Sequence, residues 1–200
     1  GTEQLESILE GRFPDLTIAR VDRDSMSRKG VLTRTLTAFD EGRIDMLAGT
    51  QMIAKGHDFH NVTLVGVISV DNGLGMPDFR AAERTFQLLT QVAGRAGRGE
   101  LAGRVIIQTY YPEHYAIRHA ANQDFDAFFA EELKFRERFS YPPFVILALI
   151  SIRHTDLRYA HEQANLMRSA LEKANNDTAG RIYGVAPASL ARLRGEYRLQ

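Results

Sequence analysis

Leu47-Ala-Gly-Thr-Gln-Met-Ile-Ala-Lys-Gly-His-Asp-Phe59 is the stretch that decides the fold of this chain, together with Gln91-Val-Ala-Gly-Arg-Ala-Gly-Arg98. The first stretch begins as a short apolar strand and continues into a polar loop. The second is the end of an amphipathic helix that passes into a loop of glycine and arginine. A nearly continuous apolar run, residues 62–70, lies between them. Buried strands that alternate with helices are typical of a parallel sheet.

Residues 1–122 alternate predicted strands with predicted helices. Strands are expected over 16–21, 46–49, 62–70 and 103–109, because these runs are apolar and rich in branched side chains. Helices are expected from Thr2, across 31–39 and from 79 to about 93, with Thr2 and Asp78 as N-caps. Residues 71–78 hold two glycines and a proline and are expected to form an irregular loop. The predicted fold class is α/β, a parallel sheet with helices on both faces.

Residues 123–143 are expected to link this lobe to a second domain. A helix from about Asp124 has an aromatic stripe whose spacing favours core packing over base stacking, namely Phe125, Phe128, Phe129, Leu133 and Phe139. A rigid break, Tyr141-Pro-Pro143, follows it. In residues 144–200, strands are expected over 144–152, over 181–185 and from Tyr197, with a helix after Asp156. This order predicts an α+β domain with a split β-α-β sheet, whose last elements are expected beyond Gln200.

Composition excludes several classes of protein. A hydrophobic share of 44% is enough for a packed core, and 25 basic residues balance 25 acidic ones, so nucleic-acid contact requires a local patch. There is no cysteine, and the six histidines lack the spacing of a zinc helix, so no metal site is expected in this chain. The absence of cysteine fits a cytosolic setting, and no stretch has the length of a membrane span or the pattern of a leader. The start at Gly1-Thr2-Glu3 without Met is expected of a piece of a longer protein.

Two arginines in the second stretch, Arg95 and Arg98, suit the chemistry of phosphate transfer. When water attacks the terminal phosphate of ATP, the negative charge on the transferring oxygens must be neutralised. Arginines held by Gly94 and Gly97 on a loop can supply that charge from across a cleft when two lobes close. The alternative is that both arginines cap carbonyls at the end of the preceding helix. The paired stretches favour the first interpretation, a second motor lobe of a nucleic-acid-dependent ATPase.

The first stretch is expected to contact nucleic acid. Thr50 lies where a strand ends, so its hydroxyl and nearby backbone N–H groups can bind a phosphate. Gly56 permits a close backbone approach, and Asp58 can accept from a ribose hydroxyl or orient an arginine. Lys55 is either another phosphate contact or a solvated surface residue. His57 is interpreted as a loop-packing or coupling residue. Without a phosphate-binding loop of the Gly-x-x-x-x-Gly-Lys type, the chain alone is not expected to hydrolyse ATP.

These stretches closely resemble the bacterial primosomal replication-restart helicases of superfamily 2. The resemblance also includes Pro77-Asp-Phe-Arg-Ala-Ala-Glu-Arg84, Tyr141-Pro-Pro-Phe144 and the segment from Gly184 to Gly195. The opening Gly1-Thr2-Glu3 is similar to the family's motif IV, which meets the DNA backbone. Residues 50–58 are similar to its motif V, and 91–98 to its motif VI.

The resemblance implies an ATP-dependent 3′ to 5′ DNA helicase of the bacterial cytoplasm that acts at stalled or branched forks. Forked or single-stranded DNA, single-strand-binding protein and primosome proteins would be its partners, with no membrane. ATP and Mg²⁺ would be shared with a first lobe upstream, and zinc would belong to the longer protein only. The implied site residues are Arg95 and Arg98 for catalysis, Gly56, Asp58, Gln91 and Gly94 for the nucleotide, and Thr2, Thr50, Gln51 and Lys55 for DNA. Residues 196–200 are less basic and less aromatic than the family pattern.

Two other functions fit the same residues. The chain could belong to a degenerate motor that serves as a docking module for primosome or single-strand-binding proteins. It could also belong to a translocase on double-stranded DNA. A missing phosphate-binding loop upstream would favour the docking module, and strand-displacement assays would separate the translocase from the helicase.

Overall fold

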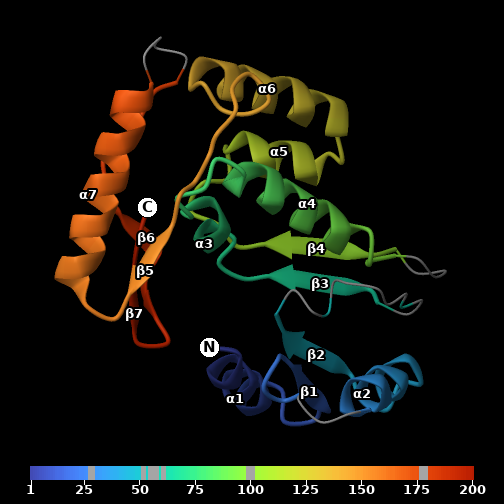
Figure 1. Cartoon of the computed structure of the whole chain (residues 1–200). Coiled ribbons are helices and arrows are strands. Elements are labelled where there is room, and N and C mark those ends of the chain that lie inside the picture. The colour runs from blue at the N-terminus through green and yellow to red at the C-terminus, as the bar shows by residue number, and fades with distance from the viewer. Residues whose placement is uncertain (27–29, 51–52, 54–58, 60–61, 98–101, 176–179) are drawn as a thin grey trace. The chain divides into compact units, whose positions relative to one another are not determined.

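The chain forms two compact units, Gly1–Phe135 and Arg136–Gln200, in a computed structural model (Figure 1). The structure describes residues 1–26, 30–50, 53, 59, 62–97, 102–175 and 180–200. Within this part of the chain, no helix is both long and apolar enough to cross a bilayer.

The first unit contains two pairs of parallel strands. β1 (Ile18–Val21) pairs with β2 (Met46–Gly49), and β3 (Leu64–Val67) pairs with β4 (Arg104–Ile107). α1 (Thr2–Arg12) packs on the first pair, and α2 (Val31–Asp40) connects its two strands. The prediction of an α/β unit with parallel strands is therefore confirmed.

The predicted single sheet differs from the observed arrangement, because the described strands of this unit form two separate two-stranded sheets. Burial in β3 and β4 alternates along the strands. Leu64 and Ile106 are 58% and 54% exposed, whereas Val67 and Ile107 pack against the core. This alternation means that helices cover one face of the pair and leave the other open.

The core of the first unit lies between β3–β4 and three helices. These are α4 (Ala81–Ala93), α5 (Tyr115–Ala121) and α6 (Phe125–Arg138), the last of which runs into the second unit. α4 lies along one side of the strands and α5 packs against α4 (Figure 1). The rings of Phe86 and Phe128 stack with centroids 4.0 Å apart. The buried side chains are Val70, Phe86, Leu89, Ala116, Ile117, Ala120 and Phe128.

The predicted packing of the whole α6 stripe is wrong. Phe128 is 4% exposed, but Phe125, Phe129 and Phe139 are 61%, 51% and 51% exposed. A helix that packs through one narrow line of contact buries only the side chains on that line. α5 was also not predicted.

Three local predictions in the first unit need correction. Gly1, and not Thr2, is the N-cap of α1, because the Thr2 side chain turns to another partner. The expected loop after residue 70 contains a one-turn helix, α3 (Asp71–Leu74). α4 begins at Ala81, and Asp78 accepts from the backbone N–H of Arg80 ahead of it, without capping the helix.

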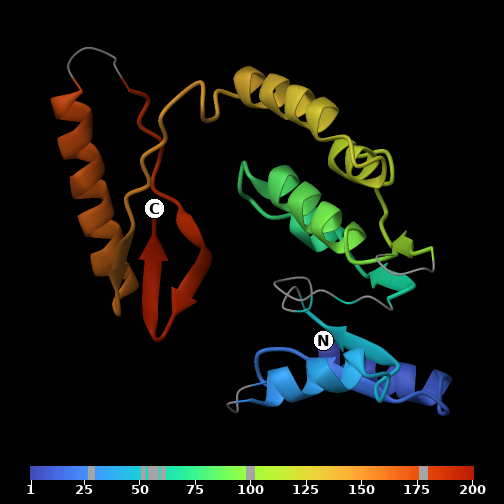
Figure 2. The same cartoon turned by 90° about the vertical axis from the view of Figure 1, so that its right-hand side faces the viewer.

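The second unit is a three-stranded sheet with one long helix. β5 (Ile152–His154) and β6 (Pro187–Leu193) both pair antiparallel with β7 (Glu196–Leu199), which lies between them. β5 and β6 are therefore parallel to each other, and α7 (Leu157–Ala174) connects them. This is the strand order of a split β-α-β unit. Figure 2 shows α7 along one side of the three strands.

Strand positions in this unit differ from the prediction in two places. Residues 144–151 are not assigned to a strand although they are strongly apolar, and residues 181–185 precede β6 instead of forming a strand. A strand requires a partner, and β7 is a strand of four residues. The predicted helix after Asp156 is confirmed, since the Asp156 carboxylate accepts from the backbone N–H groups of Arg158 and Tyr159 as an N-cap.

Candidate functional site

The carboxyl end of β2 places Thr50 at the surface. An added Cβ on Gly49 would come 2.0 Å from the carbonyl oxygen of Val21, so this position admits only glycine. The close approach lets the backbone N–H of Thr50 donate to the same oxygen of Val21 at 3.3 Å. The Thr50 side chain is consequently exposed beside the end of β1. Thr50 thus lies at the end of a strand, as the sequence predicts.

The carboxyl end of β1 carries a tightly held carboxylate, Asp22. Its Oδ1 accepts from the backbone N–H groups of Ser25 and Asp24 at 2.8 and 3.1 Å, and its Oδ2 accepts from the Thr2 hydroxyl at 2.6 Å. The bond from the Ser25 backbone, then the bond from Thr2, lower the pKa of Asp22 from 3.8 to about 2. Asp22 is therefore an anion at neutral pH and accepts the only hydroxyl proton of Thr2.

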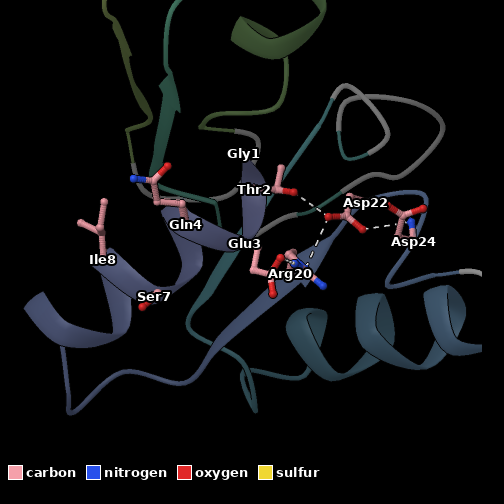
Figure 3. A pocket seen from close by; sticks show the side chains of 9 residues that line it. All are labelled: Gly1, Thr2, Glu3, Gln4, Ser7, Ile8, Arg20, Asp22 and Asp24. Atoms are coloured by element: carbon pink, nitrogen blue, oxygen red, sulfur yellow. Dashed lines mark hydrogen bonds and ion pairs between the residues drawn. The ribbon is translucent and has the colours of Figure 1, made fainter.

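Thr2 and Asp22 line an open groove of about 720 Å³ (Figure 3). Arg20 lies in it, within 3.4 to 3.8 Å of carboxylate oxygens of Asp22, Glu6 and Glu3. The lining contains the carboxylates of Glu3, Asp22 and Asp24 against the one guanidinium of Arg20, so it is negative, which disfavours phosphate. The groove is lined by Gly1, Thr2, Glu3, Gln4, Ser7, Ile8, Arg20, Asp22 and Asp24, so it includes neither Thr50 nor Arg95.

The loop after α4 is held by close backbone packing. α4 ends at Ala93, and the N–H groups of Gly94 and Arg95 donate to Thr90 and Val92. Gly97 has a φ of +75°, and an added Cβ there would come 2.6 Å from the backbone nitrogen of Gly103. Glycine is required at this position both for its φ and for this approach. Arg95 follows the helix end directly, and its side chain is partly buried, with Nε enclosed by protein.

A backbone hydrogen bond joins the second decisive stretch to a residue that follows the first. The N–H of Gly97 donates to the carbonyl oxygen of Val62 at 3.0 Å, and Val62 lies three residues after Phe59. Phe59 is 6% exposed, and its ring packs edge-on against Phe39 with centroids 5.1 Å apart. These two contacts tie Phe59 and Val62 to other parts of the first unit.

The structure describes half of the predicted site residues. Gln91 is exposed in the last turn of α4, Gly94 is the C-cap of that helix, and Arg95, Thr50 and Thr2 lie as stated above. The remaining five, Gln51, Lys55, Gly56, Asp58 and Arg98, lie outside the described residues, as does His57.

Sequence reasoning missed Asp22 and the two close approaches at Gly49 and Gly103. The Asp22 carboxylate accepts from the backbone N–H of Asp24 in an Asx turn, and the Asp-Arg-Asp-Ser sequence is typical of such turns. Neither close approach was predicted, because the atoms that an added Cβ would meet lie beyond the adjacent residues, at Val21 for Gly49 and at Ala96 and Gly97 for Gly103.

Metal-binding capacity is limited in this part of the protein. Within the described ranges, no group of three or more His, Asp or Glu side chains is placed to hold an ion. The guanidinium group of Arg95 and nearby backbone N–H groups are hydrogen-bond donors, which suit the phosphates of a nucleotide. Donors of this kind cannot coordinate its Mg²⁺, which requires oxygen ligands.

Comparison with known proteins agrees with this arrangement of strands, helices and loops. Residues 1–100 match the helicase conserved C-terminal domain, and the chain belongs to that family. Over its whole length it is also similar to proteins named replication restart protein PriA. Identity is 48% with that of Bacillus subtilis (strain 168), of which the chain covers 25%. Identity is 44% with that of Treponema pallidum (strain Nichols) and 43% with that of Haemophilus influenzae (strain KW20), of which it covers 30% and 27%.

The resemblance seen in the sequence is thus confirmed: the chain is similar to the PriA proteins from end to end. The chain spans about a quarter of the length of these relatives.

Proposed function

We propose that this chain is the second motor lobe and part of the accessory domain of an ATP-dependent DNA helicase. The helicase would translocate 3′ to 5′ and restart replication at stalled or branched forks. The observation that carries the proposal is the similarity of the whole chain to the replication restart proteins, together with its helicase C-terminal domain. The proposed division is a lobe over residues 1–122, a link over 123–143 and an accessory domain over 144–200.

The proposed catalytic groups are the guanidiniums of Arg95 and Arg98. They would neutralise charge on the terminal phosphate of ATP as a water attacks it, once another lobe brings the nucleotide to this loop. Gln91 and Gly94 would position the loop, and Gly56 and Asp58 would approach the nucleotide from the other stretch. The hydrogen bond between Gly97 and Val62 supports this division of roles, because it ties the arginine loop to the chain that follows Asp58.

The proposed DNA contacts come from the same stretch of sequence and from the start of α1. Thr50, Gln51 and Lys55 would bind backbone phosphates at the end of β2, where Thr50 is exposed. Thr2 would contribute its backbone N–H, because its hydroxyl proton is donated to Asp22. The negative groove beside it makes Thr2 a weaker phosphate contact than Thr50.

ATP with Mg²⁺ is the proposed cofactor, and the magnesium ligands would come from another lobe. Single-strand-binding protein and primosome proteins are the proposed partners, with zinc held elsewhere in the longer protein and the cytoplasm as the location.

The decisive experiment is Arg98→Ala in the full-length protein. Nucleotide binding should be retained, and DNA-stimulated ATP hydrolysis should fall by roughly three to five orders of magnitude. Arg84→Ala is the matched control, because Arg84 is exposed on α4 and pairs with Asp78 at 2.9 Å. Undiminished hydrolysis by Arg98→Ala would rule out the motor role. A strand-displacement assay that compares forked DNA with plain duplex DNA then distinguishes a helicase, which separates the strands, from a double-strand translocase, which does not.

A further inference from the structure

The carboxyl ends of β1 and β2 lie side by side, and a polar residue follows each of them directly. Val21 and Gly49, the last residues of the two strands, are register partners. Asp22 follows Val21 and Thr50 follows Gly49, and the backbone N–H of Thr50 donates to the carbonyl oxygen of Val21 at 3.3 Å. The hydroxyl of Thr2 donates to the Asp22 carboxylate, so the start of α1 reaches the same edge (Figure 3). Asp22 is therefore linked to Thr2 by its side chain and to Thr50 through the backbone of Val21.

The Asp22 carboxylate is held from several directions. Asp22 is 8% exposed, and its Oδ1 accepts from the backbone N–H groups of Asp24 and Ser25 at 3.1 and 2.8 Å. Its own backbone N–H donates to Oγ of Ser25 at 3.0 Å. Nε of Arg20 lies 3.4 Å from Oδ2, the oxygen that also accepts from Thr2. Because both carboxylate oxygens have partners, the carboxylate has a fixed orientation, and it fixes the position of the Thr2 side chain.

The same carboxylate weakens any contact of this edge with phosphate. It is an anion at neutral pH, because its hydrogen bonds lower the pKa of Asp22 to about 2, and an anion repels a neighbouring phosphate. The hydroxyl of Thr2 has one proton, and that proton is donated to Asp22. Thr2 consequently has only its backbone N–H to offer to a phosphate. Weak contacts dissociate quickly, and a motor that advances along a strand must release each phosphate before it binds the next.

We propose that Asp22 is a positioning residue for the DNA strand, which holds Thr2 at the carboxyl end of β1 and keeps the contact of this edge with DNA phosphates weak enough for release. This inference rests on the proposed function, in which Thr2 and Thr50 contact the DNA backbone. In this role Asp22 acts through Thr2 and through its own charge, and its carboxylate does not touch the DNA.

The test is Asp22→Asn in the full-length protein, with binding of a labelled single-stranded oligonucleotide measured by fluorescence anisotropy. Asparagine removes the charge, and its Nδ2 can donate to Oγ of Thr2, which leaves the hydroxyl proton free for a phosphate. The variant should therefore bind the oligonucleotide roughly tenfold more tightly, as expected for a gained hydrogen bond to a charged group. The DNA concentration that half-saturates ATP hydrolysis should fall by a similar factor, whereas the KM for ATP should stay unchanged.

The matched control is Asp24→Asn. Asp24 is exposed and lines the same groove, but the carboxylate that accepts from Thr2 belongs to Asp22. Removing this neighbouring charge should tighten binding by less than about twofold, because solvent and salt screen it.

Thr2→Val tests whether the effect passes through the hydroxyl. Valine keeps the backbone N–H and the branched shape but has no proton to donate. The double variant T2V/D22N should therefore gain only as much affinity over Thr2→Val as Asp24→Asn gains over the unmodified protein. Thermal melts followed by circular dichroism confirm that each variant is folded at the temperature of the titration.

Two results would overturn the proposal. Equal affinities of Asp22→Asn and Asp24→Asn would mean that only the net charge of the edge matters, and a full tenfold gain in T2V/D22N would mean that Asp22 does not act through Thr2. If Thr2→Val and Thr50→Ala both left the affinity for DNA unchanged, the proposed DNA contacts would fall, and this inference with them. The motor proposal is tested separately, by ATP hydrolysis of Arg98→Ala.

Discussion

The backbone N–H of Gly97 donates a hydrogen bond of 3.0 Å to the carbonyl oxygen of Val62. This bond joins the arginine loop after α4 to Val62, two residues before β3. The two segments lie in different parts of the sequence, and each is held in place by the other.

Gly97→Ala should destabilise the protein by more than about 2 kcal/mol, since it combines an unfavourable φ with a clash. The φ of +75° disfavours any L side chain, and the added Cβ would come 2.6 Å from the nitrogen of Gly103. Gly42→Ala is the control, because Gly42 has a φ of +73° and nothing within 4 Å of an added Cβ. Urea unfolding of both variants isolates the contact with Gly103. Equal urea midpoints for Gly97→Ala and Gly42→Ala would show that the contact with Gly103 has no effect on the loss of stability.

Asp22→Asn should make the free energy of unfolding depend less on pH under acidic conditions. The folded-state pKa of Asp22 is lowered from 3.8 to about 2, so folding favours its charged form. Its contribution to stability is present above pH 3.8 and is lost as the pH falls from 3.8 through 2. Thermal melts between pH 2 and 5 check this. Thr2→Val should raise the pKa of Asp22 in an NMR titration, whereas Thr2→Ser should leave it low, because serine keeps the hydroxyl donor.

His114→Asn should remove a pH dependence that lies near neutrality. Nδ1 of His114 accepts from the backbone N–H of Ala116 and caps α5, and burial lowers the pKa of His114 below 6.5 against the pull of Glu131 and Glu132. Folding therefore favours the neutral ring, and stability should fall as the pH drops below 6.5.

Asparagine keeps a capping acceptor but does not titrate, so the His114→Asn protein should have a flatter melting profile between pH 5 and 8. His114→Ala removes the cap and should cost about 1 kcal/mol at pH 8. If the melting temperature of His114→Asn depended on pH as steeply as that of the unmodified protein, the titrating group would not be His114. His161→Asn, on the exposed surface of α7, is the control for histidine removal.

Phe128→Ala should cost about 3–5 kcal/mol in the free energy of unfolding, which is typical of removing a buried aromatic ring. Phe128 is 4% exposed and stacks on Phe86 at 4.0 Å. The adjacent Phe129 is 51% exposed, so Phe129→Ala should cost less than about 1 kcal/mol. Denaturant titration of the two variants gives their free energies of unfolding and shows whether α6 packs through Phe128 alone or also through Phe129. A cost for Phe129→Ala that matches Phe128→Ala would mean that the outer stripe is also packed.

Arg194→Asn should stabilise the second unit by a few tenths to about 1 kcal/mol. Arg194 and Gly195 form the two-residue turn between β6 and β7, with φ values of +52° and +86°, and such turns favour Asn-Gly. Gly195→Ala should instead destabilise by about 1–2 kcal/mol. Thermal denaturation followed by circular dichroism checks both. A fall in melting temperature for Arg194→Asn would show that the arginine side chain contributes a contact that outweighs the turn preference.

The sequence alone determined the order of most helices and strands in the first unit, and in the second unit the helix after Asp156 and the type of sheet, although the strand predicted over 181–185 lies at Pro187–Leu193. These features depend on periodicity, caps and glycine positions that act over a few residues, such as the Asp156 cap of α7. The same local patterns identified the two decisive stretches and hence the family. They failed for residues 144–151, where strong strand preference was not enough without a partner strand.

The tertiary structure decided which distant groups meet. Thr2 donates to Asp22 instead of capping α1, Phe128 is buried while its neighbour is not, and Arg153 lies opposite Arg198. No local pattern encodes these pairs, because strand register and helix contact are set by burial and hydrogen bonding summed over the whole unit. The sequence therefore determined what class of protein this is, and the fold determined which of its polar and charged side chains remain available to bind.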